Sequence, residues 1–287
     1  MLQTIPWLLT VYLYTPVFYR LYRGGWAVSD YTHAYFILPL SLLIVWLKRN
    51  EIRQIHLKVY SSTEQHPKGT PLTSHFLLLT PYFPGLALLI LGLGMFIFGW
   101  RWDYLFISTL SLIPLLFGMC LFLYNKNFAR ILAFPILYLL LLVPFPVGVL
   151  DSITLPMRYA ASVISAYILK AMGYDIVREG LLINIGGHEI FMGAPCSGFR
   201  SLITMISLGL IYIYFNKGTM SKNTILFISI IPLALVGNLA RVIALCLITF
   251  HFGEAAGQGF FHNFSGMVVF LIIILGLMGL EKLPGNK

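Results

Sequence analysis

Residues 193–215 read GAPCSGFRSLITMISLGLIYIYF, a short turn-forming stretch followed directly by an apolar run. Glycine, proline and serine favour a turn at the start, and no charged residue follows Arg200 before the run ends at Phe215. An apolar run of this length is typical of a helix that crosses a bilayer. The pattern therefore predicts a membrane span with the thiol of Cys196 and the guanidinium of Arg200 at its N-terminal end.

The composition of the whole chain extends this interpretation. Its 287 residues are 59% hydrophobic and 10% charged, whereas soluble domains carry about 25% charged residues, and the mean hydropathy is +0.86. We therefore predict an all-α polytopic membrane protein with about eight transmembrane helices in one bundle, formed by a single domain over residues 1–287. The net charge of +9 is scattered over short loops, which indicates membrane topology and anionic lipid rather than nucleic-acid binding.

Apolar runs of about 20 residues or slightly fewer define the predicted spans. They cover about 2–19, 34–47, 76–99, 104–124, 131–150, 198–215, 224–250 and 265–280. Eleven lysines and arginines fall in one set of loops: Lys48, Arg49, Arg53, Lys58, Lys68, Lys126, Arg130, Lys217, Lys222, Lys282 and Lys287. Six fall in the opposite set: Arg20, Arg23, Arg101, Arg158, Lys170 and Arg178.

This charge bias predicts the orientation in a plasma (inner) membrane. Because cytoplasmic loops carry the excess of lysine and arginine, the first set and both termini are expected in the cytoplasm. The polar segment 48–75 is expected to be a flexible cytoplasmic loop. The N-terminus has no basic segment and no small-residue cleavage site, so no cleavable signal peptide is expected.

Residues 151–172 and the segment after them do not fit a simple span. Polar residues recur at near-helical spacing in 151–172, which predicts an amphipathic helix lying on the outer surface. A spanning helix is the alternative, but it would move Lys217 and Lys222 outside, against the charge bias. The following LLINIGGHEIFM holds two apolar runs around Gly186-Gly187, which predicts a short extracytoplasmic hairpin leading to Cys196.

Three chemically active residues are predicted at the same outer boundary of the membrane. Cys196 lies at the outer end of one span, Arg241 lies inside another, and His262 precedes the last. A charge inside a span costs at least about 2.5–3.5 kcal/mol. Arg241 therefore snorkels to the headgroups, pairs with a backbone carbonyl, or faces a polar cavity, where Asn238, one turn earlier, would orient it.

Cys196 and His262 form a candidate nucleophile and base. A helix N-terminus and Arg200 one turn on are expected to favour the thiolate of Cys196, although a lone cysteine is more often a packing residue. His262 would act as base and then as acid, although an outer-loop histidine is as often merely solvated. His33, His188 and His251 are also predicted outside, but the sequence has no HExxH motif and no closely spaced histidine pair, so no metal is expected.

Three motifs occur in order, with an apolar span between each: Cys196-Ser197-Gly198-Phe199-Arg200-Ser201-Leu202, Asn238-Leu239-Ala240-Arg241 and His262-Asn263-Phe264-Ser265-Gly266. In these motifs the chain resembles the exosortase and archaeosortase group of polytopic membrane cysteine transpeptidases. The resemblance is strongest over about 150–270 and extends to Asp30 and His33 near the N-terminus. Pro195 departs from it, because an acidic or other residue is expected before the cysteine.

The resemblance implies an enzyme without cofactors that processes exported proteins bearing a C-terminal motif (PEP-CTERM in one bacterial branch), a transmembrane helix and a basic tail. It implies catalytic roles for Cys196, Arg241 and His262, with cleavage at the outer interface through a thioester and transfer to an envelope acceptor. Arg200, Ser197, Asn238 and His33 are candidate supporting or substrate-binding residues.

Three other interpretations of the sequence remain. The chain could be a transporter or channel with Arg241 in its pathway, although no inverted repeat is evident. It could be a non-catalytic envelope or exopolysaccharide assembly factor in which these residues are structural. A serine protease using Ser197 or Ser201 is the third, although the sequence has no GxSxG motif.

Overall fold

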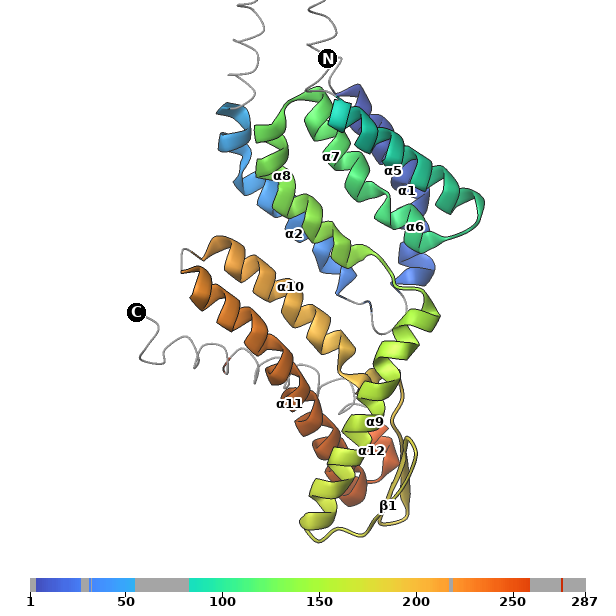
Figure 1. Cartoon of the computed structure of the whole chain (residues 1–287). Helices are drawn as coiled ribbons and strands as arrows, with labels where there is room; N and C mark the ends of the chain where they lie inside the picture. The colour runs from blue at the N-terminus through green and yellow to red at the C-terminus, as the bar shows by residue number, and fades with distance from the viewer. Residues whose placement is uncertain are drawn as a thin grey trace, which may run out of the picture. The chain divides into compact units, whose positions relative to one another are not determined.

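The computed structural model describes residues 4–26, 31, 33–54, 83–216, 219–258 and 275. The chain divides into two compact units, Met1–Phe145 and Pro146–Lys287, both shown in Figure 1. Helices dominate the described part of each unit. The predicted single domain over residues 1–287 stays a prediction.

The described residues of the first unit form helices. They are α1 (Ile5–Arg20), the π-helix η1 (Leu21–Gly25), α2 (Ala34–Leu47), α5 (Phe83–Arg101), α6 (Leu105–Leu110), α7 (Leu112–Leu123), α8 (Lys126–Tyr138) and the 3-10 helix η3 (Leu139–Leu142). Asn125 begins α8, because its side chain accepts a hydrogen bond from the Phe128 backbone at 2.8 Å, as helix-capping asparagines do.

Glycines bring α5 and α7 into close contact along one face. Gly85, Gly92 and Gly99 are buried at seven-residue spacing on α5. A β-carbon at position 92 would lie 2.7 Å from the backbone nitrogen of Leu115, whereas one at Gly94 would meet no atom within 4 Å. Small residues at a helix interface let membrane helices approach closely, so Gly85 and Gly92 set the separation of α5 and α7, and Gly99 sets the close approach of α5 to Ser108 on α6.

A buried polar contact joins α1 to the α6–α7 junction. The hydroxyls of Tyr14 and Ser111 lie 2.7 Å apart, and Ser111 donates its own hydrogen to the Ser108 carbonyl at 2.7 Å. Tyr14 is therefore the donor in the first bond. The ring of Tyr14 also lies 5.0 Å from that of Phe96, which ties α1 to α5 as well.

The second unit combines helices with a small sheet. Its elements are α9 (Val147–Ala171), β1 (Ile176–Glu179), β2 (Leu182–Ile185), β3 (His188–Phe191), the 3-10 helix η4 (Ala194–Ser197), α10 (Phe199–Phe215), α11 (Met220–Phe252) and α12 (Glu254–Gln258). In Figure 1, α10 and α11 run side by side, and α9, the sheet and α12 gather at the C-terminal end of α11.

The sheet is antiparallel with the strand order β1-β2-β3. Strands β2 and β3 pair around Gly186-Gly187, with Ile185 opposite His188. Both glycines have positive φ angles, as tight hairpin turns require. This is the hairpin turn that the sequence predicts, but β1 is a third strand that the sequence analysis missed. The position of the sheet outside the cytoplasm stays a prediction.

Helix α9 covers the segment predicted to be amphipathic, and its two faces are distinct. Thr154, Ser162 and Ser165 are buried, whereas Tyr159 and Tyr167 are exposed. The polar stripe thus faces the protein, and the apolar stripe is open to the surroundings, as lipid contact requires. This pattern suits a helix at the surface of the bilayer and one inside it, so the interfacial position stays a prediction.

Three helical segments in the described ranges are long and apolar enough to cross a membrane: Phe83–Arg101, Leu105–Leu123 and Ser221–Phe252. Two shorter apolar helices are Ala34–Leu47 and Phe199–Phe215. Large apolar side chains such as Leu8 and Val11 (each 68% exposed) lie on the outer surface of α1. Such surfaces are unfavourable in water and suited to a bilayer. The predicted number of eight spans stays a prediction.

Two sequence predictions need correction, and others lie outside the described residues. The predicted span 131–150 is not one helix, because η3 ends at Leu142 and α9 begins at Val147. Pro144 and Pro146 cause this break, since proline lacks an N–H and disfavours helix in the residue before it. The predicted loop 48–75 begins with helical residues at 49–54. Its remainder, residues 76–82 and most of 265–280 fall outside the described ranges.

Candidate active site

Cys196 lies in the short helix η4, immediately before α10. Its backbone N–H donates to the Gly193 carbonyl at 3.0 Å, and the residue is 4% exposed. Gly198 follows with φ = +76°, a left-handed conformation that glycine adopts without strain. The chain therefore turns at Gly198 into α10 while holding Cys196 inside the unit.

Asn238 on α11 fixes the cysteine turn from the other side. Its Nδ2 donates to the Cys196 carbonyl at 3.0 Å, and its side chain lies against Gly198. A β-carbon at position 198 would come within 2.6 Å of the Asn238 Cγ. Position 198 is thus restricted to glycine both by its backbone conformation and by the close approach of α11.

The side chain of Cys196 belongs to an apolar cluster. The cluster draws on α9, the sheet and α11 and contains Ala161, Leu169, Ile183, Ile185, Ile190, Met192, Cys196, Val242, Leu245 and Cys246. Burial raises the pKa of the Cys196 thiol above its ordinary value. The charge of Arg241, a hydrogen bond with the Gly193 backbone and the charge of Arg158 lower that pKa by less. Burial therefore outweighs the neighbouring positive charges, and the net preference for the thiolate that the sequence predicts is wrong for this structure, whereas the separate effects of the helix start and of Arg200 stay predictions.

Arginines from three helices lie around this turn. Arg241 on α11 and Arg158 on α9 both lie close enough to Cys196 to act on its charge. The Arg158 side chain is 12% exposed and donates to the Thr154 hydroxyl at 3.1 Å. The Nε of Arg200 on α10 is buried and has no hydrogen-bond partner among the described residues. Arg241 and Arg158 therefore place positive charge near Cys196, although Arg158 also pairs with Asp151 at 3.3 Å.

Arg158 lies near the site although the sequence analysis assigned it no part there beyond the charge count of the outer loops. In the structure the stripe of Thr154, Arg158, Ser162 and Ser165 on α9 faces the protein. The sequence did contain a signal for this arrangement, namely the polar stripe itself. A polar stripe on a mostly apolar helix has to contact either water or polar groups of the same protein.

The other predicted site residues fall in different places. Ser197 is 1% exposed, and its Oγ accepts a hydrogen bond from the Phe199 backbone at 3.1 Å, so it stabilises the start of α10. His33 is 5% exposed in the first unit, with its ring 5.8 Å from that of Tyr31. His262 lies outside the described residues. The roles of His33 and His262 in the site stay predictions.

The chain matches the model of one protein family, described as transmembrane exosortase (Exosortase_EpsH), over residues 26–279. This match covers most of the chain, and the protein therefore belongs to the transmembrane exosortase family and is a membrane protein. No curated protein and no solved structure matches the chain. The matched range contains the positions of Cys196, Arg241 and His262 and most of each compact unit.

Proposed function

We propose that this protein is a membrane cysteine transpeptidase that cleaves the C-terminal sorting tails of exported proteins. The observation that carries the proposal is the buried Cys196 thiol, which lies within electrostatic range of Arg241 while Asn238 holds its carbonyl. Family membership supports the same chemistry. The enzyme acts in the inner membrane with both termini in the cytoplasm and its active site on the outer side.

The first half-reaction forms a thioester. His262 takes the proton of the Cys196 thiol, and the thiolate attacks the scissile carbonyl carbon. The guanidinium of Arg241 stabilises the oxyanion of the tetrahedral intermediate, a contribution often worth several kcal/mol. When the intermediate collapses, the C–N bond breaks and His262 returns the proton to the leaving amine.

The second half-reaction transfers the protein to an acceptor. A nucleophile on an envelope molecule attacks the thioester carbonyl, the C–S bond breaks, and the proton of the nucleophile returns to the sulfur through His262. Apolar side chains surround Cys196, and exclusion of water suppresses hydrolysis of a reactive intermediate. This arrangement supports transfer over hydrolysis.

Arg200 is proposed to recognise a carboxylate of the sorting motif. Its buried Nε has no partner among the residues that the structure describes, and a guanidinium binds a carboxylate through two parallel hydrogen bonds. Lysine cannot reproduce that geometry. Full activity of Arg200→Lys would exclude this role.

The test is processing of a tail-bearing exported protein co-expressed with the enzyme and followed on a gel. Cys196→Ala and His262→Ala should abolish processing, and Arg241→Met should slow it by about 10²–10³, at equal membrane abundance. Cys246→Ala is the matched control, because Cys246 is buried in the same apolar cluster but has no proposed role. Continued processing by Cys196→Ala or Cys196→Ser would refute the nucleophile and favour a transporter or an assembly factor.

A further inference from the structure

The turn between α5 and α6 marks one surface of the membrane. Phe83–Arg101 and Leu105–Leu123 are consecutive candidate spans, so the three residues between them lie where both spans leave the bilayer. Trp100, Trp102 and Tyr104 are 42%, 58% and 53% exposed there. Aromatic residues of this kind gather at the level of the lipid headgroups.

The end of α1 and the adjoining η1 reach the same surface, and each brings one arginine. Arg20 forms an ion pair with Asp103, and its guanidinium lies 5.1 Å from the centre of the Trp100 ring. Arg23 donates to the Tyr19 hydroxyl at 3.2 Å. Asp103 has φ = +63°, a conformation that is uncommon for residues other than glycine and indicates a turn held in place by its surroundings.

A cavity of about 400 Å³ opens between these groups, lined by Arg20, Arg23, Gly24, Gly25, Asp103 and Leu105. A side chain at position 24 would meet no atom within 4 Å, so glycine leaves the cavity open. Two guanidinium groups and one carboxylate give the lining a net positive charge. Guanidinium groups suit phosphate oxygens because they donate in pairs.

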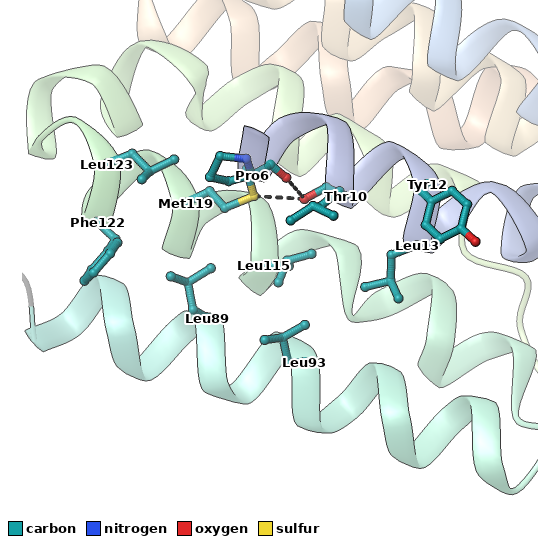
Figure 2. A pocket seen from close by; sticks show the side chains of 11 residues that line it. Pro6, Thr10, Tyr12, Leu13, Leu89, Leu93, Leu115, Met119, Phe122 and Leu123 are labelled. Carbon is teal, nitrogen blue, oxygen red and sulfur yellow. Dashed lines mark hydrogen bonds between the residues drawn. The ribbon is translucent and has the colours of Figure 1, made fainter. Parts of the chain in front are cut away.

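An apolar groove lies further along the same helices (Figure 2). Its volume is about 380 Å³, and α1, α5 and α7 contribute its lining, with Leu9 and Leu13 on α1 and Leu89 and Leu93 on α5. Thr10 brings a hydroxyl, but it donates to the Pro6 carbonyl at 2.9 Å and contacts the Met119 sulfur at 3.1 Å. The lining is therefore suited to a hydrocarbon chain.

The near end of the groove lies within one lipid leaflet of the two arginines. Half of the hydrocarbon core is about 15 Å thick, which corresponds to about ten helical residues. Ten residues before Arg20 on α1 is Thr10, and ten residues before Arg101 on α5 is Leu91, so the groove, lined from Leu13 back to Pro6 on α1, extends to both sides of the middle of the bilayer. An acyl chain whose headgroup lies at Arg20 therefore reaches the near end of the groove, at Leu13 and Leu93, with its terminal carbons.

We propose that the first unit binds a phospholipid, with its phosphate on Arg20 and Arg23 and the end of an acyl chain in the groove between α1, α5 and α7. The charge of the cavity selects the phosphate, and the apolar groove selects the chain. The site does not depend on the proposed transpeptidase reaction, and its test measures binding alone.

The test uses the delipidated, full-length protein in detergent and native mass spectrometry with added phosphatidylglycerol. One molecule should remain bound, and Arg23→Gln should weaken its binding by about tenfold, as the loss of a charge-assisted contact does. Arg23 is the residue to change because Arg20 also holds Asp103. Arg101→Gln is the matched control, since Arg101 ends α5 at the same surface but does not line the cavity, and it should bind as the parent does.

Two further ligands separate the contribution of the phosphate group from that of the acyl chains. Diacylglycerol lacks the phosphate, and inorganic phosphate lacks the chains, so each should bind at least tenfold more weakly than the phospholipid. Leu93→Trp, which fills the groove, should weaken the phospholipid and leave inorganic phosphate unchanged. Equal binding of diacylglycerol, equal binding of phosphate, or parent-like binding by Arg23→Gln would each overturn the proposal.

Discussion

Gly198→Ala should loosen the turn that holds Cys196, and the structure gives the size of the effect. Alanine in the left-handed conformation at φ = +76° costs about 1–2 kcal/mol. Its β-carbon would also lie 2.6 Å from the Asn238 Cγ, which displaces Asn238 from the Cys196 carbonyl and loses a hydrogen bond worth about 1 kcal/mol. The total cost is about 2–3 kcal/mol.

Two other variants separate these contributions. Gly187 has φ = +87°, and a β-carbon there would meet no atom within 4 Å, so Gly187→Ala carries the backbone strain without the clash. Asn238→Ala loses the hydrogen bond without the strain. Gly198→Ala should therefore open the cysteine turn more than either variant alone.

The assay is the rate of maleimide labelling of Cys196 in detergent. The other two cysteines of the chain, Cys120 and Cys246, are both replaced by alanine so that Cys196 alone can react. Cys196 is 4% exposed, so the parent should label slowly. An opening made easier by about 1 kcal/mol raises the open population roughly fivefold. Labelling should rise at least fivefold in Gly198→Ala and stay near the parent rate in Gly187→Ala. Equal rates in these two variants would refute the account of the turn.

Three further predictions concern titration and packing. Because burial raises the pKa of Cys196, its thiolate fraction at neutral pH is low, and alkylation of Cys196 should accelerate as the pH rises past the ordinary range of a thiol. Arg241→Met removes a charge that lowers this pKa, so it should move the pH profile of alkylation to still higher pH. A shift of the profile to lower pH would contradict this. Ser111→Ala should lower the melting temperature more than Tyr14→Phe does. The serine change leaves the buried Tyr14 hydroxyl without its acceptor, at a cost of about 1–3 kcal/mol. In Tyr14→Phe, by contrast, the Ser111 hydroxyl keeps its hydrogen bond to the Ser108 carbonyl. Gly92→Ala should destabilise the first unit by about 1–3 kcal/mol, measured by thermal unfolding in detergent. Gly94→Ala should have little effect, because a β-carbon there would meet no atom within 4 Å.

Much of the helical framework follows from sequence, because the signals are local. The predicted span 34–47 coincides with α2, and 198–215 agrees with α10 to one residue. The Gly186-Gly187 turn was also predictable, since two glycines between apolar runs favour a hairpin. Strand β1 was not, because its residues Ile176–Glu179 show no clear pattern until β2 pairs with them.

Those site residues were predictable whose side chains are unusual at their position in the chain. Arg241 stood out because a charge inside a span is costly, and Cys196 stood out because it precedes a span in a flexible turn. Arg158 was missed because the direction of a polar stripe depends on tertiary contacts. The contact between Asn238 and Gly198 joins residues 40 positions apart in the chain, and neither helix alone reveals it.

The pKa of Cys196 shows how magnitudes decide between opposing effects. A helix N-terminus is worth about 0.3–1 kcal/mol at an exposed position, which is less than one pKa unit, whereas full burial can move a pKa by several units. In this apolar cluster burial outweighs the neighbouring positive charges, and the resting group is a thiol. In the proposed reaction a base must therefore remove the proton when the substrate arrives. His262 is then required for the attack itself as well as for the departure of the amine, so His262→Ala should block thioester formation rather than only slow its resolution.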